Sequence, residues 1–401
     1  MPEADQGHRP ILIAGAGIAG LALGIGLARR GLSARILERR VEPMEAGAGI
    51  QLSPNAMQVL RRLGVADTIE ERAGRPEAIV VADGASGRRL ARFPLGVAME
   101  QRFGAPYRVV HRADLHAALL GVARATAGLE ISAGFEVTRW RTDGDDVVVS
   151  ALEGAEALGT SLIGADGTWS AVRRRLFPDH PLTYAGKMAV RTLLPMSAVS
   201  ARFREPVTGV WLGQDAHVVH YPVRANREIA VVVIVDEGSP REGWGGEIGA
   251  VNVQARLVRF SSELLEFLSL ASEWRAWSLY DPPRLPGWSD GNVGLIGDAA
   301  HPILPFLAQG GAMALEDAET LSGLLAVHPA DPAAALQRME ALRRPRVQRV
   351  AAASRENGRV FHLGGALGLA RNLVLGAVPG SMMMRRYDWL YGWNGDAAVG
   401  S

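Results

Sequence analysis

The sequence predicts an α/β protein in which a Rossmann-like fold receives an inserted sheet-rich domain and ends in a helical C-terminal region. Three observations predict it: a strand, a glycine-rich turn and a helix open the chain, strands dominate residues 184–279, and helical sequence runs from Gly310 to the end. Alternating strands and helices are typical of a parallel sheet covered by helices, whereas a run of strands predicts a separate sheet. We place the divisions at residues 1–183, 184–284 and 285–401.

The first strand, turn and helix are clearly marked. Ile11–Ala14 is a short apolar run, typical of a buried strand, and Ile18–Arg30 has apolar residues at helical spacing. Gly31 follows as a C-terminal stop, because glycine adopts the left-handed conformation that ends many helices. Ala34–Leu37 is a second apolar strand, and it ends on the acidic residue Glu38.

The next elements continue the α/β pattern. Ser53 and Pro54 open a helix that ends before Gly64, since serine caps free amides and proline suits the first helical position. A helix is expected over 113–125, and alternating apolar residues over 135–151 flank a polar turn, which predicts a hairpin.

The later segments change character. A helical stretch is expected over 251–270, and Val293–Ile296 returns as a buried strand. The expected strands of the inserted domain are Met188–Leu194, Gly209–Leu212, His217–Val223 and Glu228–Val235.

Composition excludes several classes of function. The chain has 43 basic and 42 acidic residues, so its net charge of +1 provides no field to attract nucleic acid. It has no cysteine, which excludes disulfides, thiolate metal sites and a cysteine-linked cofactor, and we assign no metal site. The first ten residues lack the apolar core of a signal peptide, and no apolar run of about 20 residues could span a membrane. We therefore expect a cytoplasmic protein with a small-molecule partner.

The opening turn matches a dinucleotide-binding fingerprint, G-x-G-x-x-G, over Gly15–Gly20. Gly15 permits the tight turn, Gly17 lets the backbone approach a pyrophosphate, and Gly20 lets helix and strand pack closely. Glu38 follows about 20 residues later, at the position that binds a free ribose hydroxyl. The motif fits FAD or NAD equally, and a tight turn with no ligand is the alternative.

Two further motifs favour FAD. They are Gly164-Ala165-Asp166-Gly167 and Gly297-Asp298-Ala299-Ala300-His301-Pro302, and with the opening turn they occur in the order seen in the flavin-dependent aromatic hydroxylases. The chain resembles this family over nearly its whole length, within the branch of salicylate hydroxylase and 3-hydroxybenzoate 6-hydroxylase. The tail segments Arg344–Arg346, Ser354–Gly358 and Tyr387–Gly392 are similar to that branch, and we expect them to be structural.

The resemblance implies a non-covalently bound FAD. It assigns Asp298 to the ribityl hydroxyls, Arg112 to the pyrophosphate, and the turn that opens the helix after Gln309 to the flavin ring. Asp166 is assigned to FAD or nicotinamide contacts, although a strand-end turn residue is the alternative. The expected FAD-binding residues are Gly15, Gly17, Ala19, Gly20, Glu38, Arg39, Gly49, Ile50, Arg112, Asp166, Asp298, Gly310, Gly311, Ala312 and Met313.

The same resemblance implies a monooxygenase reaction. NADH or NADPH binds transiently and reduces FAD, and dioxygen then gives a flavin C4a-hydroperoxide that hydroxylates a phenolic or heteroaromatic ring. The protein must bind the aromatic substrate, exclude water and help a phenol lose its proton. Monomer and homodimer are both compatible with the sequence.

His217 is the expected catalytic base, because histidine titrates near neutral pH and the resemblance places a phenol-activating residue there. On a strand, His217, Val219 and Tyr221 share one face and His220 faces the other way, since side chains alternate. Tyr221 is expected beside the substrate. Pro305 is expected over the reactive edge of the flavin, where some relatives have a glutamine that contacts substrate.

Three other functions remain open from the sequence. The first is a flavin monooxygenase that tailors a polyketide or quinone-type metabolite. The second is a non-catalytic FAD-binding protein of the same fold. The third is an NAD-dependent dehydrogenase, for which the glycine turn and Glu38 would serve equally well. The absence of a Trp-x-Trp-x-Ile-Pro signature argues against a flavin halogenase.

Overall fold

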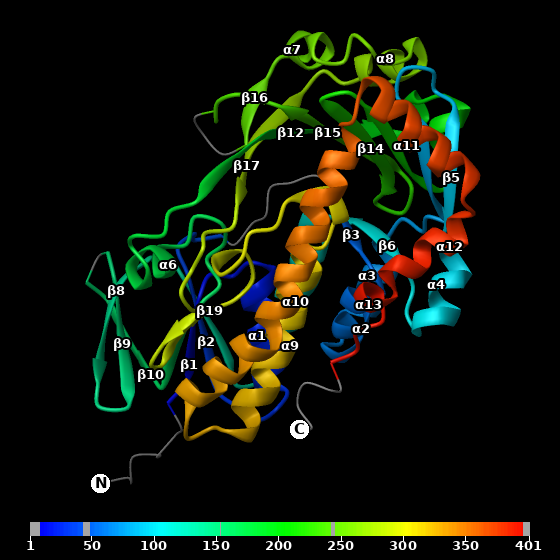
Figure 1. The fold of residues 1–401 in the computed structure, drawn as a ribbon. Helices are drawn as coiled ribbons and strands as arrows, with labels where there is room; N and C mark the ends of the chain where they lie inside the picture. The colour runs from blue at the N-terminus through cyan, green and yellow to red at the C-terminus, as the bar shows by residue number, and fades with distance from the viewer. Residues whose placement is uncertain (1–8, 43–48, 153, 242–244, 396–401) are drawn as a thin grey trace, which may run out of the picture.

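The structure is a computed structural model that describes residues 9–42, 49–152, 154–241 and 245–395. Gly47 and Ala48, which directly precede the predicted FAD-binding residues Gly49 and Ile50 and resemble the same family loop, lie outside these residues. Two sheets dominate, with the long helices α9 (Gly310–Val327) and α10 (Pro332–Phe361) beside them (Figure 1). The mixed α/β class predicted from the sequence is confirmed.

The first sheet has six strands in the order β18-β19-β11-β1-β2-β7. Its strands are parallel except for β18, which pairs with β19 in the antiparallel sense. Parallel strands bury both faces, which explains why the strand at 11–14 is apolar throughout. The strand bounds are β1 (Ile11–Ala14), β2 (Ala34–Glu38), β7 (Leu129–Ala133), β11 (Ser161–Gly164), β18 (Ser289–Asp290) and β19 (Val293–Leu295).

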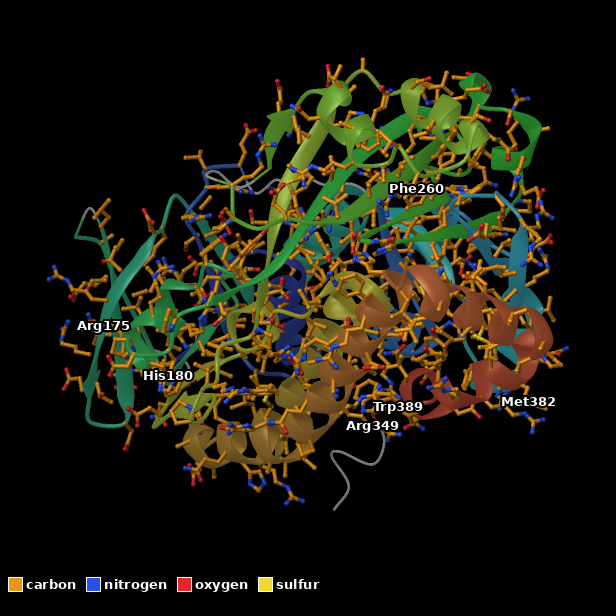
Figure 2. The ribbon with its side chains drawn as sticks, turned by 45° about the horizontal axis from the view of Figure 1, so that its top comes forward. Arg175, His180, Phe260, Arg349, Met382 and Trp389 are labelled. Atoms are coloured by element: carbon orange, nitrogen blue, oxygen red, sulfur yellow. The ribbon has the colours of Figure 1, made fainter. Side chains whose placement is uncertain are left out.

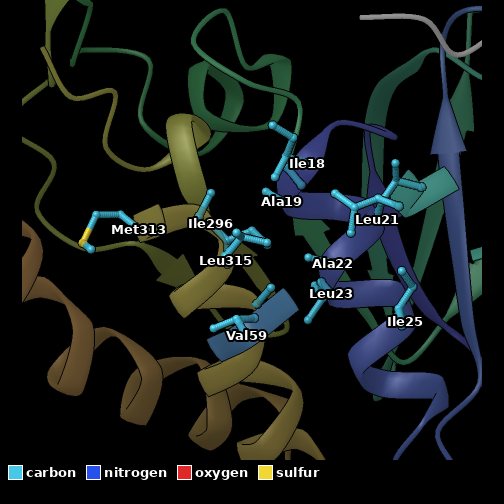
Figure 3. Packing of buried hydrophobic residues seen from close by; sticks show 14 of the residues in the cluster. Ile18, Ala19, Leu21, Ala22, Leu23, Ile25, Val59, Ile296, Met313 and Leu315 are labelled. Atoms are coloured by element: carbon cyan, nitrogen blue, oxygen red, sulfur yellow. The ribbon is translucent and has the colours of Figure 1, made fainter. Parts of the chain in front are cut away.

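Helices cover this sheet and share one core with it. Helix α1 is almost wholly buried, and Figure 3 shows Leu23 and Ile25 of α1, with Leu315 of α9, in this core. Helix α2 supplies Val59 to the same cluster. The bounds are α1 (Ile18–Ala28), α2 (Pro54–Arg62), α3 (Ala66–Arg72), α4 (Gly96–Phe103), α5 (Arg112–Ala125), α6 (Ala171–Leu176) and α9 (Gly310–Val327).

The expected cap of α2 is not made. Ser53 precedes Pro54 as predicted, but its hydroxyl makes no bond to a helix amide. It donates instead to the Asn55 Oδ1 at 2.6 Å and accepts from the Gln309 Nε2 at 2.9 Å. Because the buried side chain of Gln309 is hydrogen-bonded to this hydroxyl, Ser53 connects α2 to the start of α9.

The second sheet has eight strands in the order β16-β17-β12-β15-β14-β13-β4-β5. Its pairs are antiparallel except β13 with β4. Strands β4 and β5 come from the first part of the chain, so residues 184–284 do not supply the whole sheet. The bounds are β4 (Ala78–Asp83), β5 (Arg89–Pro94), β12 (Thr183–Pro195), β13 (Val207–Gly213), β14 (Ala216–Val223), β15 (Glu228–Asp236), β16 (Gly246–Ile248) and β17 (Trp274–Asp281).

One face of the eight-stranded sheet is covered by two short helices, α7 (Ala250–Ala255) and α8 (Ser262–Ser269), at the top of Figure 1. The single helical stretch predicted over 251–270 is thus two helices separated by a turn. Phe260 lies in that turn and packs beneath the helices (Figure 2). Phe203 and Phe267 stack there at 3.9 Å between ring centroids.

Two small sheets complete the strands. The predicted hairpin over 135–151 consists of β8 and β9, and β10 pairs with β9 as a third strand. A separate two-stranded sheet, β3 and β6, lies next to α2. The bounds are β3 (Gly49–Leu52), β6 (Arg108–His111), β8 (Val137–Asp143), β9 (Asp146–Ala151) and β10 (Glu156–Gly159).

The C-terminal region is helical, as predicted. Helix α10 is 30 residues long, and Arg349 on it lies over the Trp389 ring at 3.8 Å (Figure 2). Within the described residues, no single helix is long and apolar enough to cross a membrane; only the bent pair of α10 and α11 meets that test together. The bounds are α10 (Pro332–Phe361), α11 (Gly365–Ala377), α12 (Gly380–Met384) and α13 (Asp388–Tyr391).

Candidate active site

A cavity of about 410 Å³ lies between the two sheets. It is bounded by the carboxyl ends of β1, β2 and β11, by the start of α9, and by one face of the eight-stranded sheet. The carboxyl edge of a parallel sheet is the usual place for a ligand in such folds. Of the eighteen residues predicted from the sequence, fifteen line this cavity; the exceptions are Gly20, Ala312 and Met313.

The glycine turn has the conformation that its residues predict. Gly15 has φ +103°, and a Cβ there would lie 2.8 Å from the backbone oxygen of Ala165. A Cβ on Gly20 would lie 2.0 Å from the Gly15 oxygen, so Gly20 serves helix packing rather than the cavity. Gly17 is the N-cap of α1, and Ala19 in its first turn also lines the cavity.

Glu38 ends β2 at the rim of the cavity. Its carboxylate accepts from the backbone amides of Ala16, at 2.8 Å, and Arg40, at 2.9 Å. One bond reaches each oxygen, which holds the carboxylate in place and leaves further lone pairs for a ligand hydroxyl. Arg39 lines the cavity next to it.

Asp298 follows β19 in a short 3₁₀ turn and faces the start of α9. Its Oδ2 lies 3.4 Å from the Thr168 hydroxyl. Gly310 and Gly311 open α9 at the cavity, and a Cβ on Gly311 would lie 2.7 Å from the Ile50 side chain. Backbone and Ile50 therefore approach closely enough to form a narrow slot, with a helix N-terminus at its end.

Ala312 and Met313 differ from the prediction. Both side chains are fully buried in the core and do not line the cavity. The physical reason is helical periodicity. Successive side chains of a helix point in different directions, so those of residues 312 and 313 in α9 point into the core and not into the cavity. Neither side chain faces the cavity, so their predicted contact with a flavin stays a prediction that only their backbone could meet.

Asp166 and Arg112 line the middle of the cavity. One oxygen of Asp166 accepts from the amides of Ala171, at 2.7 Å, and Val172, at 3.2 Å, at the start of α6. Its other oxygen, Oδ1, is buried and has no partner among the described residues. Asp166 thus has the turn-forming role considered above, and its second oxygen is available to a ligand.

Arg173, six residues after the motif Gly164–Gly167, was not among the predicted site residues. Its buried guanidinium donates to the backbone oxygens of Ala299, at 2.9 Å, and Thr168, at 2.6 Å. These bonds join the two motifs that flank the cavity. An arginine following the second motif was the available signal.

One face of the eight-stranded sheet forms the opposite wall. His217, Val219 and Tyr221 all line the cavity, as the strand alternation predicted. The paired strands β15 and β12 add Val232 and Arg191, which align with Val219 across the sheet.

His220 points the other way, into the core. Its ring lies 5.2 Å from that of Phe203 and 5.6 Å from that of Phe267. Burial, with Arg202 nearby, lowers the pKa of His220 to about 3. Two histidines three residues apart are thus separated by the sheet, and the prediction that they face opposite sides is confirmed.

His217 is 1% exposed and lies among aromatic rings. The ring centroids of Phe306 and Phe361 are 5.5 and 5.2 Å away, and its Nδ1 lies 2.8 Å from the Nε2 of His362. Burial, then the charges of His362 and Lys187, lower the pKa of His217 well below the usual 6.5. The imidazole is therefore neutral near pH 7 and available to accept a proton.

Tyr221 and Pro305 complete the predicted set. The ring of Tyr221 lies against Gly49, where a Cβ would be 2.2 Å from its Cε2. Burial raises the pKa of Tyr221 to about 12, so its hydroxyl stays protonated. Pro305 begins a 3₁₀ turn on the cavity wall and has no side-chain amide, unlike the glutamine of some relatives.

Arg191 is the main residue that sequence reasoning missed. It lines the cavity, its Nε is buried with no hydrogen-bond partner among the described residues, and its guanidinium lies 5.1 Å from the Trp277 ring. Burial lowers its pKa. A single arginine within the apolar strand Met188–Leu194 was the signal that could have found it.

Three buried tryptophans lie away from the cavity. Trp211, Trp274 and Trp277 are buried and are not among the residues that line the cavity, whereas Trp169 is. Among the described residues, no group of three histidine or carboxylate side chains is arranged to hold a metal ion.

This geometry agrees with the family to which the sequence is matched. Residues 8–354 match the FAD binding domain family. The chain belongs to this family. The flavoprotein is 37% identical over 390 residues to a 3-hydroxybenzoate 6-hydroxylase of Polaromonas naphthalenivorans, with 96% of each chain covered. It is also 37% identical to the 3-amino-4-hydroxybenzoate 2-monooxygenase PtnB3 of Streptomyces platensis, with 98% of each covered.

Solved structures share the fold of the flavoprotein. Klebsiella pneumoniae HpxO, complexed with FAD and uric acid, has a TM-score of 0.84 at 24% identity and 98% coverage of both chains. A salicylate hydroxylase substrate complex has a TM-score of 0.82 at 22% identity, again with 98% coverage of both.

The family and its relatives establish the class of enzyme. The flavoprotein is an FAD-dependent monooxygenase of the aromatic hydroxylase group. NADH or NADPH as reductant and dioxygen as co-substrate are typical of that group.

Proposed function

We propose that this monooxygenase hydroxylates a hydroxybenzoate or a closely related phenolic acid. The observation that supports this most strongly is that one wall of the cavity presents both a neutral buried histidine, His217, and a cationic arginine, Arg191. The relatives named above act on 3-hydroxybenzoate and 3-amino-4-hydroxybenzoate, and both molecules have a phenol and a carboxylate. The two side chains match these two groups.

Arg191 fits the carboxylate. Its unsatisfied, buried Nε seeks an acceptor, and a guanidinium bonds a carboxylate through two parallel N–H groups. Arg191 and His217 lie on strands separated by β15, and neighbouring strands are about 4.8 Å apart; with an offset of two residues along the strand, roughly 12 Å separates the two backbone positions. A single benzoate ring with its hydrogen bonds spans that gap.

His217 fits the phenol. Its Nδ1 is engaged by His362, so the ring nitrogen left for a substrate is Nε2. A neutral imidazole near a phenol accepts its proton and so makes the ring more electron-rich. Tyr221, which keeps its own proton, would donate a hydrogen bond to the resulting phenolate.

The residues of the opposite wall fit FAD. Glu38 would accept from the ribose hydroxyl, Arg112 would bind the pyrophosphate, and Asp298 would accept from the ribityl chain. The slot between Ile50 and Gly311 would hold the flat ring, and the N-terminus of α9 would stabilise negative charge near it. When reduced, the bound flavin supplies the activated oxygen that the protein cannot provide.

The remaining lining keeps water from the reacting atoms. The apolar residues of the lining include Val219, Val232, Ile234, Ile303 and Pro305. Such a lining strengthens every charge interaction inside the cavity, because water no longer screens it.

A substrate panel tests the proposal. Purified enzyme is mixed with FAD and with NADH or NADPH, and the oxidation of the nicotinamide nucleotide is followed in the presence of each candidate substrate. The candidates are 3-hydroxybenzoate, other phenolic acids, uncharged phenols and polycyclic quinones. We expect phenolic acids to stimulate the oxidation of NADH or NADPH. Mass spectrometry should then detect a product heavier than the substrate by about 16 mass units, the mass of one oxygen atom. Stimulation by quinones alone would support the tailoring function, and stimulation by no compound would support a non-catalytic FAD-binding protein.

Replacing Arg191 tests the choice of substrate class. Arg191→Met keeps the length of the side chain and removes its charge. We expect KM for 3-hydroxybenzoate to rise about tenfold to a hundredfold, since a charged hydrogen bond contributes about 1.5–3 kcal/mol, with little change for an uncharged phenol. The control is Arg275→Met. Arg275 is exposed and lies on β17, opposite Arg191 of the neighbouring strand β12. An unchanged KM for the acid would exclude Arg191 as its anchor.

A further inference from the structure

Three side chains connect the cavity to the surface behind His217. The Nδ1 of His217 lies 2.8 Å from the Nε2 of His362, and the Nδ1 of His362 lies 2.7 Å from the Oδ1 of Asp236. They come from β14, from the residue that ends α10, and from the end of β15. The contacts join parts of the chain that are 145 and 126 residues apart in sequence.

Exposure rises along these three residues. His217 is 1% exposed and His362 is 8% exposed, whereas the side chain of Asp236 is 44% exposed. The first group therefore meets the cavity, the second is enclosed, and the third meets solvent. A continuous line of hydrogen bonds from a closed cavity to water is the arrangement that proton transfer needs.

We infer that His217, His362 and Asp236 form a relay that carries the phenol proton of the substrate out to solvent. This inference rests on the proposed function, because it names the path taken by the proton that His217 removes. It gives His362 and Asp236 a part in the reaction, although neither lines the cavity.

The donor and acceptor pattern fixes the direction of transfer. Asp236 is ionised: burial opposes its charge, but hydrogen bonds from His362 and Lys187 outweigh it and lower the pKa of Asp236. A carboxylate only accepts, so His362 donates through Nδ1–H and, while neutral, accepts at Nε2. His217 then donates through its Nδ1–H, and the lone pair on its Nε2 faces the substrate.

The transfer balances. The phenol O–H bond breaks and its proton bonds to the Nε2 of His217, while the Nδ1 proton of His217 moves to the Nε2 of His362. The Nδ1 proton of His362 moves to the carboxylate of Asp236, which releases it to water. No electrons are transferred, and one proton reaches solvent for each phenolate formed. When product leaves as a phenol, the same steps run in reverse and restore the starting tautomers.

The neighbouring groups support charge passing through this line. Lys187 of β12 is ion-paired with Asp236, and its Nζ lies 3.2 Å from the Nδ1 of His362. Phe306 of the turn after Leu304 and Phe361 of α10 present apolar rings to His217. The positive charge of Lys187 disfavours a positive charge on His217, which leaves His217 neutral at rest, and the carboxylate of Asp236 is the proton acceptor at the solvent end.

A purely structural role for His362 makes a different prediction. If His362 only positions His217, then glutamine at 362, which can donate and accept hydrogen bonds but cannot pass a proton on, should preserve turnover. If it relays protons, His362→Gln should bind FAD and 3-hydroxybenzoate normally and turn over at least about tenfold more slowly at pH 7, within the range known for acid–base groups. Asp236→Asn should show a smaller loss in the same direction.

The pH profile and chemical rescue decide between these roles. The deficit of His362→Gln should shrink as pH rises toward about 10, where a phenol ionises unaided. In His362→Ala, added imidazole should restore turnover in proportion to its neutral form. Proton release when anaerobic enzyme binds 3-hydroxybenzoate, followed with an indicator dye, should slow in both variants. His328→Gln, at an exposed histidine that ends α9, is the control and should match wild type.

Two outcomes would overturn the relay. One is a turnover of His362→Gln within twofold of wild type at pH 7; the other is a deficit that is equal at every pH and is not relieved by imidazole. Either result leaves the proposed function intact, provided that wild-type enzyme hydroxylates the acid. If wild type oxidises no phenolic acid, the proposed function fails first and the relay fails with it.

Discussion

At the scale of single residues, environment decides what each titratable side chain can do. His217 and His220 are the same residue type on one strand, yet one meets the cavity and the other a cluster of aromatic rings. The strand period predicted this separation, but the lowered pKa of His217 depends on burial and on His362, which lies 145 residues away in sequence. Sequence could predict that His217 faces the site, and not its protonation state.

Replacing His217 should slow hydroxylation and leave FAD bound. Because the pKa of His217 is lowered below 6.5, the neutral base is present across pH 6–8, and wild-type kcat should stay flat there. In His217→Asn we expect kcat to fall by about 10²–10⁴-fold at pH 7 and to recover as pH rises toward the ionisation of the phenol. Steady-state rates at several pH values measure this, with half-buried His180→Asn as the control. An unchanged rate and pH profile would remove His217 as the base.

Replacing Asp298 should weaken FAD retention, because its carboxylate lines the cavity and its Oδ1 lies 4.0 Å from where a Cβ on Gly310, the first residue of α9, would be. Loss of a charged hydrogen bond of about 1.5–3 kcal/mol predicts a Kd for FAD raised about tenfold to a hundredfold in Asp298→Ala. The flavin absorbance per protein after gel filtration measures retention. Asp290→Ala, at an exposed position on β18, should keep its flavin. Wild-type flavin content in Asp298→Ala would contradict the assignment.

At the scale of elements, a buried charge network joins α9 to α10. Arg343 pairs with Glu316, at 2.5 Å, and with Asp317, at 2.7 Å, and Asp317 also bonds the Nε2 of His301 at 2.6 Å. Arg346 pairs with Glu316 as well. His301 and the Arg344–Arg346 segment, the latter expected to be structural, thus lie at the contact between α9 and α10.

Breaking this network should destabilise the fold. Arg343→Leu would remove one buried cationic partner from each of two buried carboxylates, Glu316 and Asp317, and removing one member of a buried pair costs about 3–5 kcal/mol. Urea unfolding followed by circular dichroism measures the loss. The matched control is Arg359→Leu, which removes an exposed ion pair with Glu356 on the same helix and should change stability by about 1 kcal/mol or less. Equal losses in the two variants would show that the buried network contributes no more than the surface pair.

At the scale of the whole molecule, the sequence was most informative where contacts are local. The strand, turn and helix of Ile11–Ala28 follow from spacing and glycine chemistry, and the inserted strands from alternation. The addition of β4 and β5 to the eight-stranded sheet did not follow, because β4 pairs with β13 across more than a hundred residues. Arg191 and His362 were missed for the same reason: their roles exist only once distant strands and helices meet.

The two sheets enclose one cavity, so FAD should stabilise the molecule as a unit. A ligand bound only to the folded state adds about 2.7 kcal/mol at a free concentration of 100 times its Kd. For a chain of 401 residues we expect the apoprotein to unfold several degrees below the FAD-loaded protein, with a single transition for both sheets in the loaded form. Calorimetry on apoprotein, and on apoprotein restored with FAD, measures this. Riboflavin, which lacks the pyrophosphate and adenosine, is the control and should restore little. Equal Tm values with and without FAD would mean that the cavity between the sheets is not where FAD binds.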